Sequence, residues 1–201
     1  MVFDKVFDKV TLEGPRVRLE PISISHKDGL SEAISDGELW NIFVTKVPHP
    51  KDLDEFIGNA YYALEEGDGL VFAIIDKASG KIVGSTRYMR ASPPNKRVEI
   101  GFSFIAKSHQ KTHINTETKL LMLEHAFEKL KVNRVEFVTD FLNQNSRNAI
   151  LRLGAKQEGI LRNHMVMADG RVRDSVVFTI ISNEWLGVKQ HLTAKLGPVI
   201  G

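Results

Sequence analysis

One stretch of the 201-residue chain combines polar residues in a pattern suited to binding an anion. A polar loop, Lys107 to Asn115, joins a strand-like run to the start of a long helix predicted at Thr116 to Leu130. A helix N-terminus offers free N–H donors and a partial positive charge, and Lys107 and Lys111 add two full charges. The loop therefore predicts a phosphate or pyrophosphate site, with an ordinary strand-to-helix connection as the alternative.

Other kinds of chemistry are excluded by composition or missing motifs. The chain has no cysteine, which excludes disulfides, thiolate metal sites and a cysteine nucleophile. His109 and His113 are four residues apart but precede the predicted helix without an acidic residue between them, so we expect no metal site. The G-x-x-x-x-G-K-[ST], G-x-G-x-x-G and G-x-S-x-G motifs are missing. A net charge of +2 does not favour a nucleic-acid partner.

The elements that position the loop belong to one predicted domain, residues 1–201. Hydrophobic residues make up 42% and charged residues 26% of the chain, and no Pro/Gly/Ser-rich linker divides it. Residues 1–13, which repeat Val-Phe-Asp-Lys-Val, are expected to form an N-terminal arm or an edge strand. We find no apolar run of about 18 residues and no secretory signal, so we expect no membrane partner and a cytoplasmic location.

Hydrophobic periodicity predicts an α+β fold with a mixed sheet. Alternation predicts a strand at Arg97 to Ile105, with Val98, Ile100, Phe102 and Phe104 on one face and Glu99, Gly101 and Ser103 on the other. Asn115 or Thr116 is the predicted N-cap of the long helix. The remaining expected strands cover 16–22, 71–75, 81–89, 134–139, 155–167 and 172–181, and the remaining expected helices cover 26–35, 52–66, 145–153 and 184–196.

The order of these elements and several short motifs resemble the GNAT superfamily of acyl-CoA-dependent N-acetyltransferases, and within it the RimJ/RimL-like branch. The resemblance covers about Gly14 to Trp185 and implies a mixed, mostly antiparallel central sheet flanked by helices on both faces. It also implies acetyl-CoA as co-substrate. The segments that carry it are Val98–Phe102, Ile114–Glu117, Asn143 with Ser146, Leu153–Ala155, Glu158–Arg162 and Asp169–Asp174.

Two positions depart from the family's pattern. His113 and Asn115 replace two small residues of its pyrophosphate loop, where glycine permits positive φ. Ile150 replaces a tyrosine that protonates the departing thiolate in many members. We therefore expect weaker or rearranged acyl-CoA binding.

The resemblance implies direct attack of a primary amine on the thioester in a ternary complex, without a protein nucleophile. The amine belongs to a protein N-terminus or a small molecule. The pantetheine arm is expected beside the strand end, pairing with exposed backbone. The implied cofactor-binding residues are Phe104, Ile105, Ala106, Gln110, Lys111, Thr112, His113, Ile114, Asn115, Thr116, Asn143, Ser146 and Arg147.

Two catalytic roles follow, a base and a partner of the thiolate. Glu99 is the first candidate base, and a structural carboxylate is its alternative. Glu158 is the second candidate because RimL-like enzymes carry an acidic residue at the matching place. Ser146 is the candidate partner of the thiolate, or else a simple helix cap.

The acceptor pocket is expected to include Trp40, Phe43, Tyr88 and Glu158. Arg162, Arg173 and Asp174 are expected to pair across the final hairpin. A non-catalytic acyl-CoA-binding or regulatory module with the same fold is the alternative function, and a homodimer through the terminal strands is compatible with the sequence.

Overall fold

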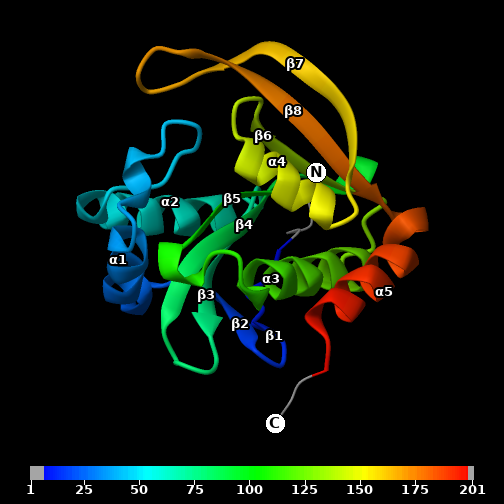
Figure 1. Cartoon of the computed structure of the whole chain (residues 1–201), viewed down its shortest axis with the longest axis horizontal. Helices are drawn as coiled ribbons and strands as arrows, with labels where there is room; N and C mark the ends of the chain where they lie inside the picture. Colours follow the sequence, from blue (N-terminus) through cyan, green and yellow to red (C-terminus); the bar gives the residue numbers. More distant parts are fainter. Residues whose placement is uncertain (1–6, 199–201) are drawn as a thin grey trace.

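The computed structural model describes residues 7–198, and within them one eight-stranded sheet runs through the molecule (Figure 1). Its strand order is β1-β2-β3-β4-β5-β6-β8-β7, and every neighbouring pair is antiparallel except β5 and β6. The strands are β1 Leu12–Glu13, β2 Val17–Pro21, β3 Leu70–Asp76, β4 Ile82–Ser92, β5 Arg97–Ile105, β6 Arg134–Asp140, β7 Lys156–Val166 and β8 Val172–Ile181.

Helices cover both faces of this sheet. The helices are α1 Lys27–Ser35, α2 Leu53–Glu65, α3 His113–Glu124, α4 Gln144–Arg152 and α5 Trp185–Leu196. Apolar residues of α3, α4 and α5 join the larger core cluster, and those of α1 and most of α2 form a second cluster. The mixed α+β fold predicted from the sequence is confirmed.

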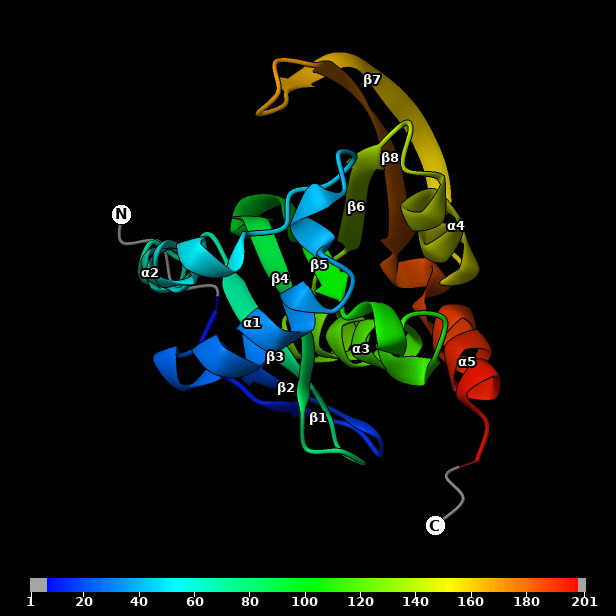
Figure 2. The ribbon, with the colours of Figure 1, turned by 60° about the vertical axis from the view of Figure 1, so that its left-hand side comes forward.

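The β7–β8 hairpin arches beyond the rest of the sheet (Figures 1 and 2). Its inner strand, β8, buries Val176, Phe178 and Ile180 against the larger core, whereas most side chains of β7 are exposed. No helix between residues 7 and 198 is long and apolar enough to span a bilayer.

A β-bulge interrupts β5 and reverses which face its later residues use. Gly101 pairs with Arg87 and Phe104 with Ser85, so β5 carries one extra residue against β4, and Phe102 has φ +46°. Ile100 therefore packs in the larger cluster and Phe104 in the second one. The prediction that Val98, Ile100, Phe102 and Phe104 share one face is wrong after the bulge.

The long helix begins earlier than predicted. Thr112 is the N-cap of α3 and its Oγ1 accepts the Ile114 N–H, so neither Asn115 nor Thr116 caps the helix. The helix continues from Glu124 into a π turn at His125–Lys129.

The N-terminal arm contributes to the core. Phe7 is buried and stacks on Tyr88, with ring centroids 5.4 Å apart. Among residues 7–198, β1 at Leu12–Glu13 pairs with β2 alone and so lies at the edge of the sheet. The first copy of the repeat, residues 2–6, lies outside the described residues, and Phe7 belongs to the second copy.

Candidate active site

The parallel strands β5 and β6 pair over a short length and then part. Their register ends at Glu99 and Glu136, although β5 continues to Ile105 and β6 to Asp140. The carboxyl half of β5 consequently has a backbone edge that β6 does not occupy. Each strand leads into a helix, β5 into α3 through the loop of residues 106–112 and β6 into α4 through residues 141–143, so two helix N-termini lie beyond the point where the strands part.

The loop between β5 and α3 is held by its own side chains. Gln110 Nε2 donates to the Ile105 carbonyl at 2.9 Å, and Thr112 Oγ1 donates to the His109 carbonyl at 2.7 Å. Ser108 donates to Asp36 at the end of α1 through both its N–H and its hydroxyl, which lowers the pKa of that carboxyl. The loop is therefore fixed at both ends before any ligand arrives.

The two unusual residues of this loop cause no backbone strain. Positive φ within residues 107–116 occurs only at Lys111, at +62°, whereas His113 and Asn115 lie inside α3. The glycine-like geometry therefore falls one position before the N-cap. Buried His113 Nε2 has no hydrogen-bond partner between residues 7 and 198, so this polar atom remains for a ligand or water.

The end of β5 offers less free backbone than predicted. Ala106 donates its N–H to Val83 at 2.8 Å and accepts from His109 N–H at 2.9 Å, so its N–H is not free for pantetheine. Phe104 is buried and packs against Phe56 of α2. The backbone contact predicted at Ala106 is thus corrected, and the free edge lies nearer the bulge.

At the second helix N-terminus, Asn143 is a helix cap. Its Oδ1 accepts the Ser146 N–H at 3.0 Å, which leaves its amide N–H groups unused by the cap. The hydroxyl of Ser146 has no hydrogen bond to another residue of 7–198. Arg147 lies over the Phe141 ring at 4.9 Å and donates to the Phe141 carbonyl. Ile150 is buried in the core, as an isoleucine there should be.

Glu99 lies where the two strands part. Its side chain is almost fully buried, and Oε2 accepts one hydrogen bond from Arg90 at 3.1 Å. Burial raises the pKa of Glu99, and the opposing effect of Arg90 is smaller. A Cβ at Gly101 would lie 3.3 Å from Glu99 Oε1, so the glycine keeps space beside the carboxylate. Ser103, predicted on the same face, lies across the bulge and contacts Lys119 instead.

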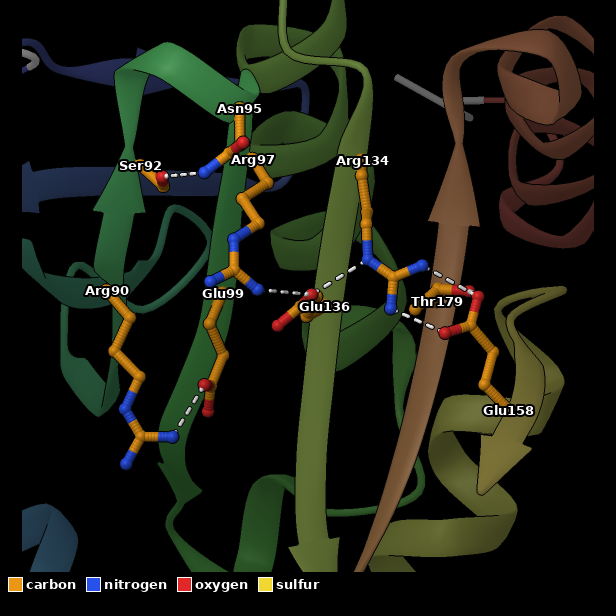
Figure 3. Close-up of polar contacts among 9 residues, drawn as sticks. All are labelled: Arg90, Ser92, Asn95, Arg97, Glu99, Arg134, Glu136, Glu158 and Thr179. Atoms are coloured by element: carbon orange, nitrogen blue, oxygen red, sulfur yellow. Dashed lines mark hydrogen bonds and ion pairs between the residues drawn. The ribbon is translucent and has the colours of Figure 1, made fainter. Parts of the chain in front are cut away.

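Glu158 occupies a different environment on the same side of the sheet (Figure 3). Arg134 donates to both of its oxygens and Thr179 Oγ1 donates to Oε1. These bonds hold the pKa of Glu158 at about 2, mainly through Arg134. A carboxylate so strongly ionised and so fully paired is a poor proton acceptor near neutral pH. Of the two candidates, the geometry favours Glu99.

The loop between α1 and α2 reaches the β7–β8 turn beside these strands. Arg171 donates to buried Asp140 at 2.6 Å and to the Phe43 carbonyl at 3.3 Å, with its guanidinium over the Phe43 ring. Phe43 is 63% exposed and so can meet an acceptor. Trp40 instead packs on His49 and the second core cluster.

Tyr88 does not line a pocket. It is fully buried, between Phe7 and Phe72, and its hydroxyl donates to the Met122 carbonyl of α3. The prediction is corrected because Tyr88 points to the α3 side of β4, where the apolar core lies.

The predicted pairing across the final hairpin is confirmed for Arg162 and Asp174, whose Nε and Oδ2 atoms lie 2.5 Å apart. Arg173 does not take part in this pairing.

Sequence reasoning also missed Arg87 and Arg90 on β4, and Asp140 at the end of β6. Their only signal was their position at alternate or terminal sites of predicted strands.

Comparisons with known proteins identify the family. A model of the acetyltransferase (GNAT) domain matches residues 16–156. N-acetyltransferase p20 of Bacillus licheniformis, whose name marks it as uncharacterised, is 25% identical over 181 residues, which is 88% of this chain and 99% of that protein. A GCN5-related N-acetyltransferase from Brucella melitensis has a TM-score of 0.84 at 33% identity, over 95% of this chain and 87% of that one.

The same fold occurs in RimJ of Mycobacterium smegmatis in complex with CoA-disulfide, at a TM-score of 0.77 and 20% identity, over 89% and 88% of the two chains. The chain belongs to the GNAT acetyltransferase family, and it is an acyl-CoA-dependent N-acetyltransferase.

Proposed function

We propose that this enzyme transfers an acetyl group from acetyl-CoA to a primary amine, on a protein N-terminus or a small molecule, by direct attack in a ternary complex. The observation that carries the proposal is the buried carboxylate of Glu99 at the point where β5 and β6 part, with two helix N-termini beyond it. In this proposal, the two helix N-termini supply an anion site, the unpaired edge of β5 holds the cofactor and Glu99 is the base.

The chain's own residues fit acetyl-CoA, which supplies the activated acetyl thioester. Lys107, Lys111 and the first N–H groups of α3 would hold its phosphates. The amide of Asn143 and the unpaired edge of β5 would hold its pantetheine arm. Unpartnered His113 Nε2 is a further polar atom available on this helix end.

Glu99 would take the proton released by the attacking amine, and Arg90 holds its carboxylate in place. Ser146 would donate a hydrogen bond to the departing sulfur in place of the tyrosine that Ile150 replaces. Water can also protonate a thiolate with an ordinary pKa of about 8.5, so this contribution is the smaller one.

CoA should stabilise the protein against heat. A ligand at a concentration of 100 Kd that binds only the folded state adds about 2.7 kcal/mol, which raises Tm by roughly 5–10 °C in a chain of this size. Differential scanning fluorimetry with increasing CoA checks this. An unchanged Tm at millimolar CoA would contradict the assignment of the cofactor.

Lys111→Glu should weaken CoA binding about tenfold or more, because it replaces a positive charge beside the diphosphate with a negative one. Lys96→Glu is the matched control. It makes the same charge change at an exposed residue that also has positive φ, but on the turn between β4 and β5. Titration calorimetry at low salt gives both Kd values. Equal values for Lys111→Glu and the unaltered protein would place the phosphates elsewhere.

A further inference from the structure

The sheet face that carries Glu99 holds more arginine than carboxylate. This face, which we call the arginine face, is formed by side chains of β4, β5, β6 and β8. Arg171 of the β7–β8 turn and Glu158 of β7 also contribute to it. Its six arginines are Arg87, Arg90, Arg97, Arg134, Arg171 and Arg173, and its four carboxylates are Glu99, Glu136, Asp140 and Glu158. The formal charge of these ten groups is +2.

All four carboxylates are already paired with four of the arginines, and Figure 3 shows the pairs that involve Glu99, Glu136 and Glu158. The pairs are Arg90 with Glu99, Arg97 with Glu136, Arg134 with Glu136 and Glu158, and Arg171 with Asp140. Arg87 and Arg173 are left over. Neither has a hydrogen bond or an ion pair with any residue of 7–198, and the Nε atom of each is buried without a partner.

Arg87 is fixed next to Glu99 by strand register. Met89 of β4 pairs with Glu99 of β5, so the two side chains share a face. Arg87 pairs with Gly101 and lies two residues from Met89, so its side chain is on the same face as Glu99. Its guanidinium lies 4.6 Å from the Phe102 ring centroid and 5.5 Å from that of Phe56. Stacking fixes the plane of the group and leaves its N–H edge free to bind an anion.

Arg173 approaches from the other side. It lies on β8 opposite Met165, two residues from Ser175, which pairs with Asp140. Its charge interacts with those of Glu99, Asp140 and Arg90, and its partial burial lowers the pKa of its guanidinium. Two half-buried guanidiniums that form no hydrogen bond or ion pair with a carboxylate are costly in the free protein, and an incoming anion would relieve that cost.

We infer that the acceptor amine carries a carboxylate, which Arg173 and Arg87 bind while the amine lies at Glu99. This inference rests on the proposed acetyl transfer. A planar guanidinium suits a carboxylate through two parallel N–H donors. The surplus positive charge also disfavours polycationic acceptors. The carboxylate comes either from the α-carboxyl group of a free amino acid or from an acidic side chain near a peptide N-terminus.

Steady-state acetylation of matched acceptors tests this. One pair is L-alanine and L-alaninamide. A second is two carboxyl-amidated pentapeptides that differ only in Asp or Asn at the second position, and spermidine is the polycation. We expect kcat/KM to favour the carboxylate member of one pair by about 10- to 100-fold, and that pair identifies the source. Equal use of both members in both pairs, or a preference for spermidine, would overturn the inference.

Variants then assign the preference to the arginines. Arg173→Gln and Arg87→Gln should each lower kcat/KM for the carboxylate acceptor about 10- to 100-fold and leave its neutral partner within about twofold. Arg97→Gln is the matched control, because it removes one charge from the same face while Glu136 keeps its bond to Arg134. A carboxylate preference that survives in both test variants would show that other groups bind the anion.

A binding experiment separates this inference from the proposed reaction. N-acetyl-L-alanine, N-acetyl-L-alaninamide and the N-acetylated peptides are titrated into protein saturated with CoA. Arg173-dependent binding of a carboxylate ligand without turnover of any amine would support the carboxylate site and refute the proposed acetyl transfer. Turnover with no discrimination by charge would refute the carboxylate site and support the transfer.

Discussion

Glu99→Gln should lower kcat by about 10²- to 10⁴-fold, the usual contribution of a general base. Glutamine has nearly the same shape and can keep a hydrogen bond to Arg90, but it cannot accept the amine proton. The affinity for CoA should stay nearly unchanged, since the proposed site gives the carboxylate no contact with the cofactor. Steady-state kinetics and CoA titration of the same protein give both quantities.

The pH dependence of this variant adds a second test. Burial raises the pKa of Glu99 above its ordinary value of 4.5, so the base is protonated and inactive below that raised pKa. Activity of the unaltered enzyme should therefore rise with pH as Glu99 ionises. In Glu99→Gln that rise should disappear, and the remaining dependence should follow ionisation of the acceptor amine alone.

Glu158→Gln is the matched control, because it makes the same change on the same sheet face at a carboxylate already paired with Arg134. It should retain most of its activity. A fully active Glu99→Gln beside an inactive Glu158→Gln would assign the base to β7. Full activity in both would show that positioning of an already neutral amine carries the catalysis. Ser146→Ala should cost less than Glu99→Gln.

Lys119→Met should make the protein more stable near pH 7, by on the order of 4 kcal/mol. Lys119 lies on α3 and is buried against the bulged part of β5, where it donates to Thr86 Oγ1 at 2.9 Å and Ser103 Oγ at 2.6 Å. No carboxylate among residues 7–198 pairs with it. Burial lowers the pKa of Lys119 from 10.5 to about 7.

The direction of this change in stability follows from proton uptake by the unfolded chain. As pH falls from 10.5 to about 7, the unfolded chain binds a proton at Lys119 that the folded chain does not. Each pH unit then costs the folded state about 1.4 kcal/mol, and the cost is complete below about pH 7. Methionine removes this cost, and the hydroxyls of Thr86 and Ser103 still bond to each other at 2.7 Å.

Urea unfolding near pH 7 and near pH 10 measures the effect. The gain from Lys119→Met should be largest at the lower pH and small at the higher one. Lys81→Met, at an exposed turn lysine, should change stability by less than about 0.5 kcal/mol at both. A Lys119→Met protein less stable than the parent near pH 7 would show that the buried amine makes a net favourable contribution.

Periodicity located the strands and helices within a few residues, because buried faces leave a regular apolar pattern. It failed at Phe102, where positive φ in a residue other than glycine adds a bulge that no alternation reveals. That failure placed Ser103 beside Glu99 and hid its contact with Lys119. The same pattern allowed Tyr88 to be predicted in the acceptor pocket. The sequence of a strand does not show on which of its faces an aromatic side chain meets the core.

The candidate site was predictable where short motifs lie on consecutive elements, as in the loop before α3 and in Asn143 with Ser146. It was not predictable where distant strands supply the partners. Whether Arg87 and Arg173 are paired depends on five strands and the loop after α1, and single-strand patterns contain no information on such pairing. Glu158 likewise became a poor base only because Arg134 and Thr179 lie across the sheet from it.

The most direct test of the central claim is a product analysis with acetyl-CoA and the amine panel described above. Mass spectrometry of the amine and a thiol assay are run on the same reaction. We expect the amine to gain one acetyl group for each CoA released, and both rates to fall together in Glu99→Gln. Release of CoA without acetylated amine, or binding of acetyl-CoA with neither product, would contradict it.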